Sequence, residues 1–304
     1  MTIGIYVNEL KDLGFTIAKR IIDAVRARGG DTRVAGKAFV QDGADLTGCD
    51  AILSVGGDGT LLKAARETLC CGAPLLGINL GSLGYLTEVE TSQIDSVLDR
   101  IFARDYRVEG RMMLEITRER PNGDRAFARA CGKNSDAGVD WNGEVFSTDI
   151  ALNELYIGRG ASPHVVRLKV YLNDAFMDVY SGDGILISTP TGSTAYALSA
   201  GGPVIDPELN AAAIIPLCPH MVFSRTVLAA PDKVITIVPV CLNGEFRADI
   251  AADGIDGAPL CGDEIIRVRR SGHVTKMLRF EADNFYGAIK NKLFESSGNF
   301  LRQS

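Results

Sequence analysis

Hydrophobic and polar positions in the first third of the chain follow two alternating patterns. Short apolar runs (IGIYV, TRVAGKA, AILSV and PLLGIN) are separated by longer amphipathic stretches at about 15–28, 60–69 and 92–104. Short apolar runs are typical of buried strands, and a period near 3.6 residues is typical of helices with one buried face. Strands that alternate with such helices predict βαβ units and a parallel sheet. We therefore expect a Rossmann-like parallel α/β domain over residues 1–109.

The pattern changes after residue 110. Asn-Gly or Asn-Asp pairs stand between runs of alternating polarity in PNGD, WNGE, LNDAF and LNGEF. Such pairs predict tight hairpin turns and therefore antiparallel strands. We expect residues 110–283 to form an all-β, antiparallel, sandwich-like domain. The segment FYGAIKNKLF then returns to a helical pattern, so the tail at about 284–304 is expected to pack back on the first domain.

Composition narrows the class of protein. A chain of 304 residues with 46% hydrophobic and 23% charged residues is typical of a globular protein with two cores. A run of about 18 apolar residues is missing, so a membrane-spanning helix is not expected. The net charge of −6 gives no attraction to nucleic acid or anionic lipid, which favours a small-molecule partner.

The cysteines and the first residues indicate a cellular compartment. The seven cysteines show no metal-ligand spacing, and we interpret them as reduced thiols, with no metal site of the protein's own. The opening MTIGIYVNEL lacks the basic and long apolar regions of a secretory signal. Together these features predict a cytoplasmic protein.

The segment AILSVGGDGTLLKAAR joins a predicted strand to a predicted helix through Gly56, Gly57, Asp58 and Gly59. A glycine turn at the carboxyl end of a strand lets backbone N–H groups approach phosphate oxygens at a helix N-terminus. An aspartate repels phosphate, but it suits a general base that takes a proton from a hydroxyl nucleophile. The structural alternative is a plain turn with a helix-capping aspartate.

A second candidate segment, SGDGILISTPTGSTAYALSAGGPVID, covers residues 181–206. Its glycines and prolines would interrupt the ladder of a plain strand, and its hydroxyl groups are too many for a loose linker. We interpret it as a ligand-lining loop. The alternative is an ordinary turn that leads into a helix from about Ala195.

Three segments together carry a family resemblance. GGDGT at 56–60 resembles the signature shared by NAD kinases, diacylglycerol kinases and sphingosine kinases, with a close variant in phosphofructokinases. LNELYIG and TPTGSTAYALSAGGP make the resemblance specific, because the order and spacing of the three segments are similar to those of the NAD kinase family. The resemblance covers about residues 3–285. Lipid kinases and phosphofructokinases lack the third segment.

The resemblance implies a role for each matching residue. Asp58 would be the base that activates the 2′-hydroxyl of the adenosine ribose of NAD, which attacks the γ-phosphate of ATP. The implied nucleotide-binding residues are Gly57, Gly59 and Thr60 at phosphates, Lys63 at the dinucleotide, Asn153 and Glu154 at the reacting ribose, Tyr85, Thr194, Ala195, Tyr196, Ala197, Leu198 and Ser199 at the adenine and ribose pocket, and His164 and Asp183 at the dinucleotide, Asp183 often across a subunit boundary.

These assignments have structural alternatives. Asn153 and Glu154 also suit a strand-end pair that makes hairpin hydrogen bonds. Tyr85 also suits a core aromatic, and His164 a structural histidine. Two departures, Ser181 for a basic residue and Ile255 for a glutamine, put some contacts to the pyrophosphate or the second nucleotide in doubt.

The resemblance also implies partners. Mg²⁺ or another divalent cation would arrive with ATP, and the protein would be a homodimer or homotetramer. Rival functions are a GGDGT-type lipid kinase, which needs an apolar entrance or a basic membrane face, and a non-catalytic dinucleotide sensor. The sequence leaves open ATP against polyphosphate, NAD against NADH, feedback by NADPH, and the role of residues 131–144.

Overall fold

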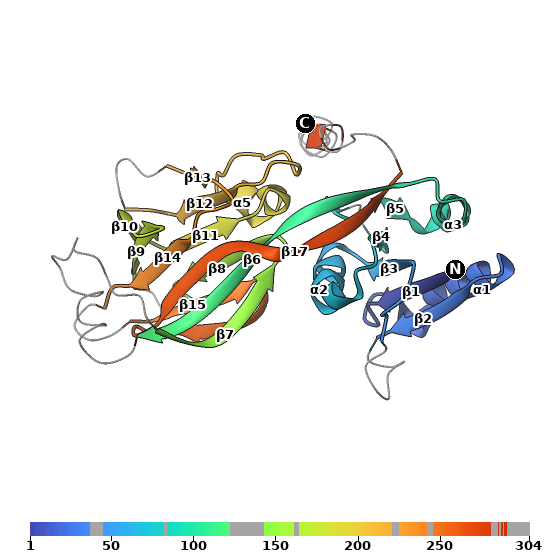
Figure 1. Ribbon diagram of the computed structural model, residues 1–304, viewed down its shortest axis with the longest axis horizontal. Helices are drawn as coiled ribbons and strands as arrows, with labels where there is room; N and C mark the ends of the chain where they lie inside the picture. The colour runs from blue at the N-terminus through green and yellow to red at the C-terminus, as the bar shows by residue number, and fades with distance from the viewer. Residues whose placement is uncertain are drawn as a thin grey trace, which may run out of the picture. The chain divides into compact units, whose positions relative to one another are not determined.

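The computed structural model describes residues 1–36, 45–81, 84–121, 143–160, 164–220, 225–241 and 246–280, with single positions at 285, 287, 289 and 290. The chain divides into two compact units. Unit 1 is Met1–Gly110 with the segment from Thr275, and unit 2 is Arg111–Val274. The return to unit 1 falls inside strand β17 (Ile265–Arg279), ahead of the position near 284 where the helical pattern resumes. Figure 1 labels the elements of both units.

Unit 1 is built on a parallel sheet. Its strands, in spatial order, are β2 (Asp31–Ala35), β1 (Thr2–Val7), β3 (Ala51–Gly56) and β4 (Leu75–Asn79), and β4 also pairs with β5 (Val89–Glu90) and with the end of β17. Every residue of β3 and β4 is buried. Continuous apolar strands of this kind are typical of parallel sheets covered on both faces.

Helices cover this sheet. The α-helices are α1 (Thr16–Ala27), α2 (Asp58–Glu67) and α3 (Ile94–Phe102), with single 3-10 turns η1 (Leu13–Phe15), η2 (Leu69–Cys71) and η3 (Thr91–Gln93). α1 and α3 share a core with β1 and β3, while α2 packs on β3 and β4. The predicted α/β alternation is confirmed. Among the described residues, no helix has the length and apolar character needed to cross a membrane.

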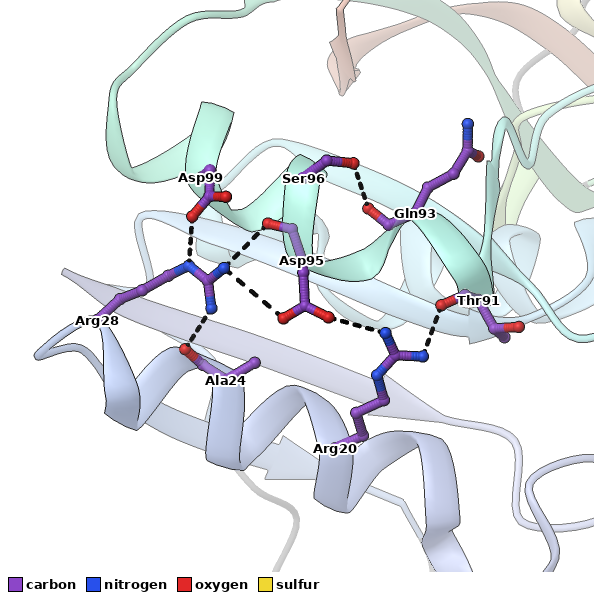
Figure 2. Close-up of polar contacts among 8 residues, drawn as sticks. All are labelled: Arg20, Ala24, Arg28, Thr91, Gln93, Asp95, Ser96 and Asp99. Atoms are coloured by element: carbon purple, nitrogen blue, oxygen red, sulfur yellow. Dashed lines mark hydrogen bonds and ion pairs between the residues drawn. The ribbon is translucent and has the colours of Figure 1, made fainter.

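Charged side chains form a polar rim between α1 and α3 (Figure 2). The Arg28 guanidinium donates to Asp99 Oδ1 over 2.8 Å and to the Asp95 carbonyl over 3.1 Å. Arg20 donates to Asp95 Oδ2 over 2.8 Å and to the Thr91 carbonyl over 2.9 Å. The carboxylates are more than half exposed, so each pair contributes at most about 1 kcal/mol. The apolar faces beneath therefore carry most of the packing energy of these two helices.

Unit 2 contains two groups of antiparallel strands. One contains β10 (Ala175–Gly182), β9 (Val166–Leu172), β14 (Ile235–Pro239) and β17, with β6 (Arg107–Pro121) pairing β17 and β7 (Gly143–Ala151). The other is a six-stranded sheet in the order β13 (Val227–Ala229), β12 (Ala212–Leu217), β11 (Gly184–Ser188), β8 (Glu154–Gly158), β15 (Ala248–Ala252) and β16 (Ile255–Leu260). Residues of both groups, such as Ile157 and Ile237, belong to one buried cluster, which confirms the sandwich-like β domain.

The hairpin predictions met different outcomes. Asn173 and Asp174 turn the chain between β9 and β10, as predicted from LNDAF. Gly143 and Glu144 of WNGE begin β7, paired with β6, while Trp141 and Asn142 lie outside the described residues, so this turn stays a prediction. The turns of PNGD and LNGEF, most of residues 131–144 and most of the predicted helical tail lie outside the described residues. One hairpin was not predicted: Asp253 and Gly254 join β15 to β16.

Residues 181–206 combine three kinds of structure. The segment begins with Ser181 and Gly182 at the end of β10, and β11 follows as a fully buried strand, because ILIS occupies a central position in the six-stranded sheet. A 3-10 turn η4 (Thr191–Thr194) and the short helix α5 (Tyr196–Ser199) follow. Gly182 and Gly184 are accommodated within strands, and the prediction that the segment is not a plain strand holds only after Ser188, where the chain leaves the sheet.

Candidate active site

The glycine turn lies where β3 ends and α2 begins. Gly57 caps the helix, and Asp58, Gly59 and Thr60 form its first turn. A Cβ on Gly56 would overlap the Thr60 side chain, so only glycine lets the chain turn this tightly. Thr60 is buried and its N–H donates to the Gly57 carbonyl over 2.8 Å. The predicted strand, turn and helix are therefore present in the predicted order.

The start of α2 presents hydrogen-bond donors. The N–H groups of Asp58 and Gly59 have no carbonyl one turn earlier to donate to, since they open the helix. Among the described residues, nothing lies within 4 Å of the position that a Cβ would take on Gly59. These donors and the positive end of the helix dipole form a surface suited to an anion.

Lys11 is a cation at this turn that the sequence reasoning missed. A Cβ on Gly57 would lie 3.0 Å from Lys11 Nζ and 4.0 Å from Asn79 Oδ1. Asn8 Nδ2 donates to Thr60 Oγ1 over 3.0 Å. Asn8 and Lys11 follow β1, and Asn79 ends β4, the strands on either side of β3. Carboxyl ends of neighbouring parallel strands meet at one edge, and that rule was the signal available for finding them.

The Asp58 carboxylate is held by four donors. Oδ2 accepts from the Tyr85 N–H over 2.7 Å. Oδ1 accepts from the Leu86 N–H (3.2 Å), the Thr87 N–H (3.0 Å) and the Thr87 hydroxyl (3.0 Å). A Cβ on Gly84 would overlap this carboxylate, so the segment that follows β4 can approach Asp58 only with glycine there. Oδ2, with one donor, keeps the greater capacity to accept a proton.

Lys63 and Tyr85, also predicted to bind the nucleotide, lie on α2 and in the segment that follows β4. Lys63 is exposed on α2, four residues after Gly59 and therefore on the same side of the helix. Tyr85 binds Asp58 through its backbone, while its side chain is half-buried. A role of the Tyr85 ring at an adenine stays a prediction.

In unit 2, Asn153 lies in the bend that joins β7 to β8, and Glu154 is the first residue of β8. Both are buried, with exposed fractions of 7% and 8%. Asn153 Oδ1 and Glu154 Oε2 have no hydrogen-bond partner among the described residues. Buried polar atoms are nearly always paired, so these two oxygens favour a donor beyond the described residues, such as a ligand. Their position at the start of β8 fits the strand-end alternative, while these two side-chain oxygens take part in no hydrogen bond among the described residues.

The backbone of this turn is fully engaged by its neighbours. Asp253 accepts from the N–H groups of residues 152, 153 and 154 over 2.8, 2.7 and 3.1 Å. The Asn153 carbonyl accepts from the Thr189 N–H over 2.8 Å. A Cβ on Gly192 would overlap that carbonyl, so η4 packs directly on the turn. The second and third sequence motifs are therefore in contact.

Glu154 has an unusual environment for an acid. Burial is the larger cause and the charge of Asp253 the smaller, and together they raise the pKa of Glu154 from 4.5 to about 7. Desolvation and a like charge both disfavour the ionised form. A strongly shifted pKa on an unpaired acid is typical of a functional site.

The segment predicted to line an adenine pocket exposes only some of its side chains. Thr194 is buried and donates to the Thr191 carbonyl over 3.3 Å. Ala197 lies in a hydrophobic cluster, so its side chain is not available to a ligand. Ala195 and Leu198 are half-buried, Ser199 is exposed, and the Tyr196 ring is 47% exposed. The Tyr196 ring lies 6.2 Å from the Tyr156 ring, centroid to centroid.

The structure does not bring Asp183 to the Glu154 turn. Asp183 precedes β11 and forms an ion pair with Arg159 over 3.3 Å. In the β8–β11 pairing, Gly184 lies opposite Gly158, and Ser188 lies opposite Glu154. Asp183 is five residues before Ser188, so Asp183 and Glu154 lie at opposite ends of these strands, roughly 17 Å apart along the strand axis. His164 is exposed, two residues before β9.

One group of side chains in the described residues has the composition of a possible metal site. Among the described residues, Cys261, Asp263 and Glu264 could approach one ion. Glu264 is already paired with Arg118 over 2.7 Å, and it accepts from the Cys261 N–H over 3.3 Å. This mixed group also lacks the all-oxygen ligand set that Mg²⁺ prefers. Cysteines 49, 70, 71, 218, 241 and 261 are free thiols.

Anion-binding N–H groups beside one fixed carboxylate suit the transfer of a phosphoryl group to a hydroxyl. The α/β unit with this turn therefore defines the chain as a phosphotransferase. Comparison with known proteins specifies the acceptor. Residues 5–106 match the ATP-NAD kinase N-terminal domain, and residues 152–280 match the ATP-NAD kinase C-terminal domain.

Relatives and solved structures agree with these matches. An NAD kinase of Acetivibrio thermocellus is 35% identical, and the match covers 97% of this chain and 98% of the relative. An NAD kinase of Moorella thermoacetica is 36% identical, and the match covers 83% of this chain and 73% of the relative. An Archaeoglobus fulgidus NAD kinase in complex with ATP has a similar fold (TM-score 0.71, 22% identity, 96% and 98% covered). So has a yeast NADH kinase complexed with NADH (TM-score 0.79, 20% identity, 97% and 87% covered). The chain belongs to the NAD kinase family, whose reaction forms NADP.

Proposed function

We propose that this protein transfers the γ-phosphate of ATP to the 2′-hydroxyl of the adenosine ribose of NAD, with Asp58 as the general base. The observation that carries this mechanism is the Asp58 carboxylate, which four donors fix at the first turn of α2. A base must be held in one orientation to act in a transition state. A helix-capping aspartate would instead bond to its own helix.

The chemical step then balances as follows. Asp58 Oδ2 takes the proton of the ribose hydroxyl, the hydroxyl oxygen bonds to the γ-phosphorus, and the bond from that phosphorus to the β,γ-bridging oxygen breaks to release ADP. The N–H groups of Asp58 and Gly59 and the Lys11 ammonium supply positive potential for the phosphates. A divalent cation bound to ATP supplies further charge neutralisation. Thr60 keeps the turn closed, and Lys63 adds a second cation one helical turn away.

Asn153 and Glu154 are proposed to hold NAD. Their unpaired oxygens, Oδ1 and Oε2, are suited to accept hydrogen bonds from ribose hydroxyls. The exposed Tyr196 ring offers a face on which an adenine can stack, with Thr194, Ala195, Leu198 and Ser199 around it. Ala197 would contribute through its backbone alone, because its side chain is in the core.

Oligomerisation follows from the position of Asp183. Asp183 lies at the far end of β11 from Ser188, a position that supports its contacting a dinucleotide bound to a second copy. We therefore propose a homodimer or homotetramer, to be tested by light scattering during gel filtration. The free thiols of the described residues support a reducing, cytoplasmic location.

The test is NADP formation by purified protein from NAD and ATP with Mg²⁺, read with an NADP-specific dehydrogenase. Asp58→Asn should lose at least about 1,000-fold in kcat while still binding NAD, since an amide cannot accept the proton. Asp95→Asn, in the first turn of α3, is the matched control and should retain activity. Full activity in Asp58→Asn would refute the base assignment.

Parallel assays separate the rival functions. No NADP from wild type with intact NAD binding would favour the sensor, and phosphorylation of a diacylglycerol instead of NAD would favour the lipid kinase. Polyphosphate in place of ATP, NADH in place of NAD, and EDTA in place of Mg²⁺ would define donor, acceptor and cation.

A further inference from the structure

The β15–β16 hairpin places an acid where its turn does not need one. Asp253 and Gly254 connect the strands with φ values of 52° and 66°. Two central residues with positive φ are typical of a type I′ turn, which Asn-Gly and Gly-Gly form as readily as Asp-Gly. The turn therefore explains a small polar residue at position 253, and it does not explain a negative charge.

The surroundings of Asp253 show what the carboxylate does. It is 9% exposed, although hairpin tips are usually solvated. Oδ2 accepts from the Leu152 N–H, and Oδ1 accepts from the N–H groups of Asn153 and Glu154, all within 3.1 Å. Its own N–H donates to the Glu154 carbonyl over 2.9 Å. One side chain thus fixes three consecutive peptide groups of a turn about a hundred residues earlier.

The hairpin between β9 and β10 shows the contrast. Asn173 there also has a positive φ, of 54°, and it is followed by Asp174. Asp174 is exposed, so its carboxylate does not bind a buried turn. Both hairpins have a positive φ at their first turn residue, but the second turn residue has a positive φ in Gly254 and not in Asp174, and only the Asp253 carboxylate is buried.

We propose that Asp253 is a positioning residue for NAD: its carboxylate fixes residues 152–154 so that the unpaired oxygens of Asn153 and Glu154 face the ribose. The inference rests on the proposed role of Asn153 and Glu154 in binding NAD. Without Asp253, three N–H groups lose their acceptor, and the backbone that carries both side chains is free to rotate. The ribose would then be held less firmly, while the phosphate turn of unit 1 keeps its own contacts.

The charge of Asp253 also affects the pKa of Glu154, an effect that a role in packing alone would not have. Ser188 of β11 lies opposite Glu154, and β15 ends directly before Asp253. Among the described residues, Asp253 is the charged group whose field shifts Glu154. Neutralising Asp253 removes a like charge, so the pKa of Glu154 falls. Burial of Glu154 remains and keeps that pKa above its ordinary value.

The experiment compares Asp253→Asn with Asp174→Asn, which removes the same charge from the exposed hairpin turn. Asp253→Asn should raise KM for NAD on the order of 10- to 100-fold and leave KM for ATP within about twofold. The acidic limb of kcat/KM for NAD, near pH 7 in wild type, should move to lower pH. Asp174→Asn should change neither quantity.

Other outcomes would overturn the inference. An unchanged KM for NAD, or an equal loss for NAD and ATP with an unmoved pH profile, would leave Asp253 a structural role only. Asp253→Gly keeps a residue that favours positive φ, so it guards against misfolding of the asparagine variant. If both variants unfold, Asp253 serves stability and the proposal fails. NAD affinity is also measured by calorimetry, so a wild type that binds NAD without making NADP would refute the proposed function and leave this inference testable.

Discussion

An alanine at Gly59 separates a ligand-binding role of the glycine turn from a structural one. Gly59 is the second residue of α2, and among the described residues nothing lies within 4 Å of the position its Cβ would take. A methyl group there meets no side chain or backbone of the described chain. It would occupy space that a phosphate needs in order to reach the N–H groups at the start of the helix.

The structure sets opposite signs for the two effects of Gly59→Ala. Alanine in a helix is favoured over glycine by at most about 1 kcal/mol, and here no clash opposes that gain. The Tm should therefore stay unchanged or rise by a few degrees. Loss of one hydrogen bond to a charged phosphate costs about 1.5–3 kcal/mol, so kcat/KM for ATP should fall roughly 10- to 100-fold.

The assay pairs calorimetric unfolding with steady-state kinetics at varied ATP. Gly84→Ala is the contrasting variant, because its Cβ would overlap the Asp58 carboxylate and displace the base. It should lower Tm and activity together. If Gly59→Ala keeps kcat/KM for ATP within twofold of wild type, phosphates do not approach this residue and the proposed anion site is wrong. A Tm that falls with activity would instead reveal a clash within the protein.

Two further variants test the charges of the site. Lys11→Gln should raise KM for ATP roughly 10-fold, since it removes an ammonium 3.0 Å from the position that a Cβ would take on Gly57. The control variant Lys19→Gln, on α1, should leave KM for ATP unchanged. Equal effects of the two variants would refute a role of Lys11 in binding phosphate. Glu154→Gln should stabilise the protein by up to about 3 kcal/mol at pH 8 and have little effect at pH 4, measured by urea unfolding. The sign follows because the folded pKa of about 7 exceeds the unfolded value of 4.5, so native stability falls as pH rises between them. A gain at pH 4 equal to that at pH 8 would contradict this reasoning.

Much of unit 1 could be predicted because its elements are long and strongly periodic. The run AILSV is buried throughout as β3, and the glycines after it allow the chain to turn directly into α2. Local sequence therefore contains both the strand and the reason why it ends. Local sequence is less decisive at Gly143, a turn-forming residue that begins β7, because long-range pairing with β6 determines where the strand starts.

Residues that reach the site through tertiary structure could not be read from local pattern. Lys11 follows β1 and becomes a neighbour of Gly57 only because β1 lies next to β3 in the sheet. Asp253 reaches residues 152–154 because β15 pairs with β8. Hydrophobic periodicity predicts strands but not their spatial order, so both contacts required the fold.

The two acids assigned to the reaction, Asp58 of unit 1 and Glu154 of unit 2, have opposite environments, and the difference separates their proposed roles. Asp58 is satisfied by four donors from a neighbouring loop, which fixes a base in place before any ligand arrives. Glu154 is buried, unpaired at Oε2 and close to another acid, an arrangement that costs native stability. A partner that donates a hydrogen bond to Oε2 removes part of this cost. A ribose hydroxyl that donates to Glu154 would do so, and the same contact would hold the reacting ribose, which is why we assign binding to Glu154 and proton transfer to Asp58.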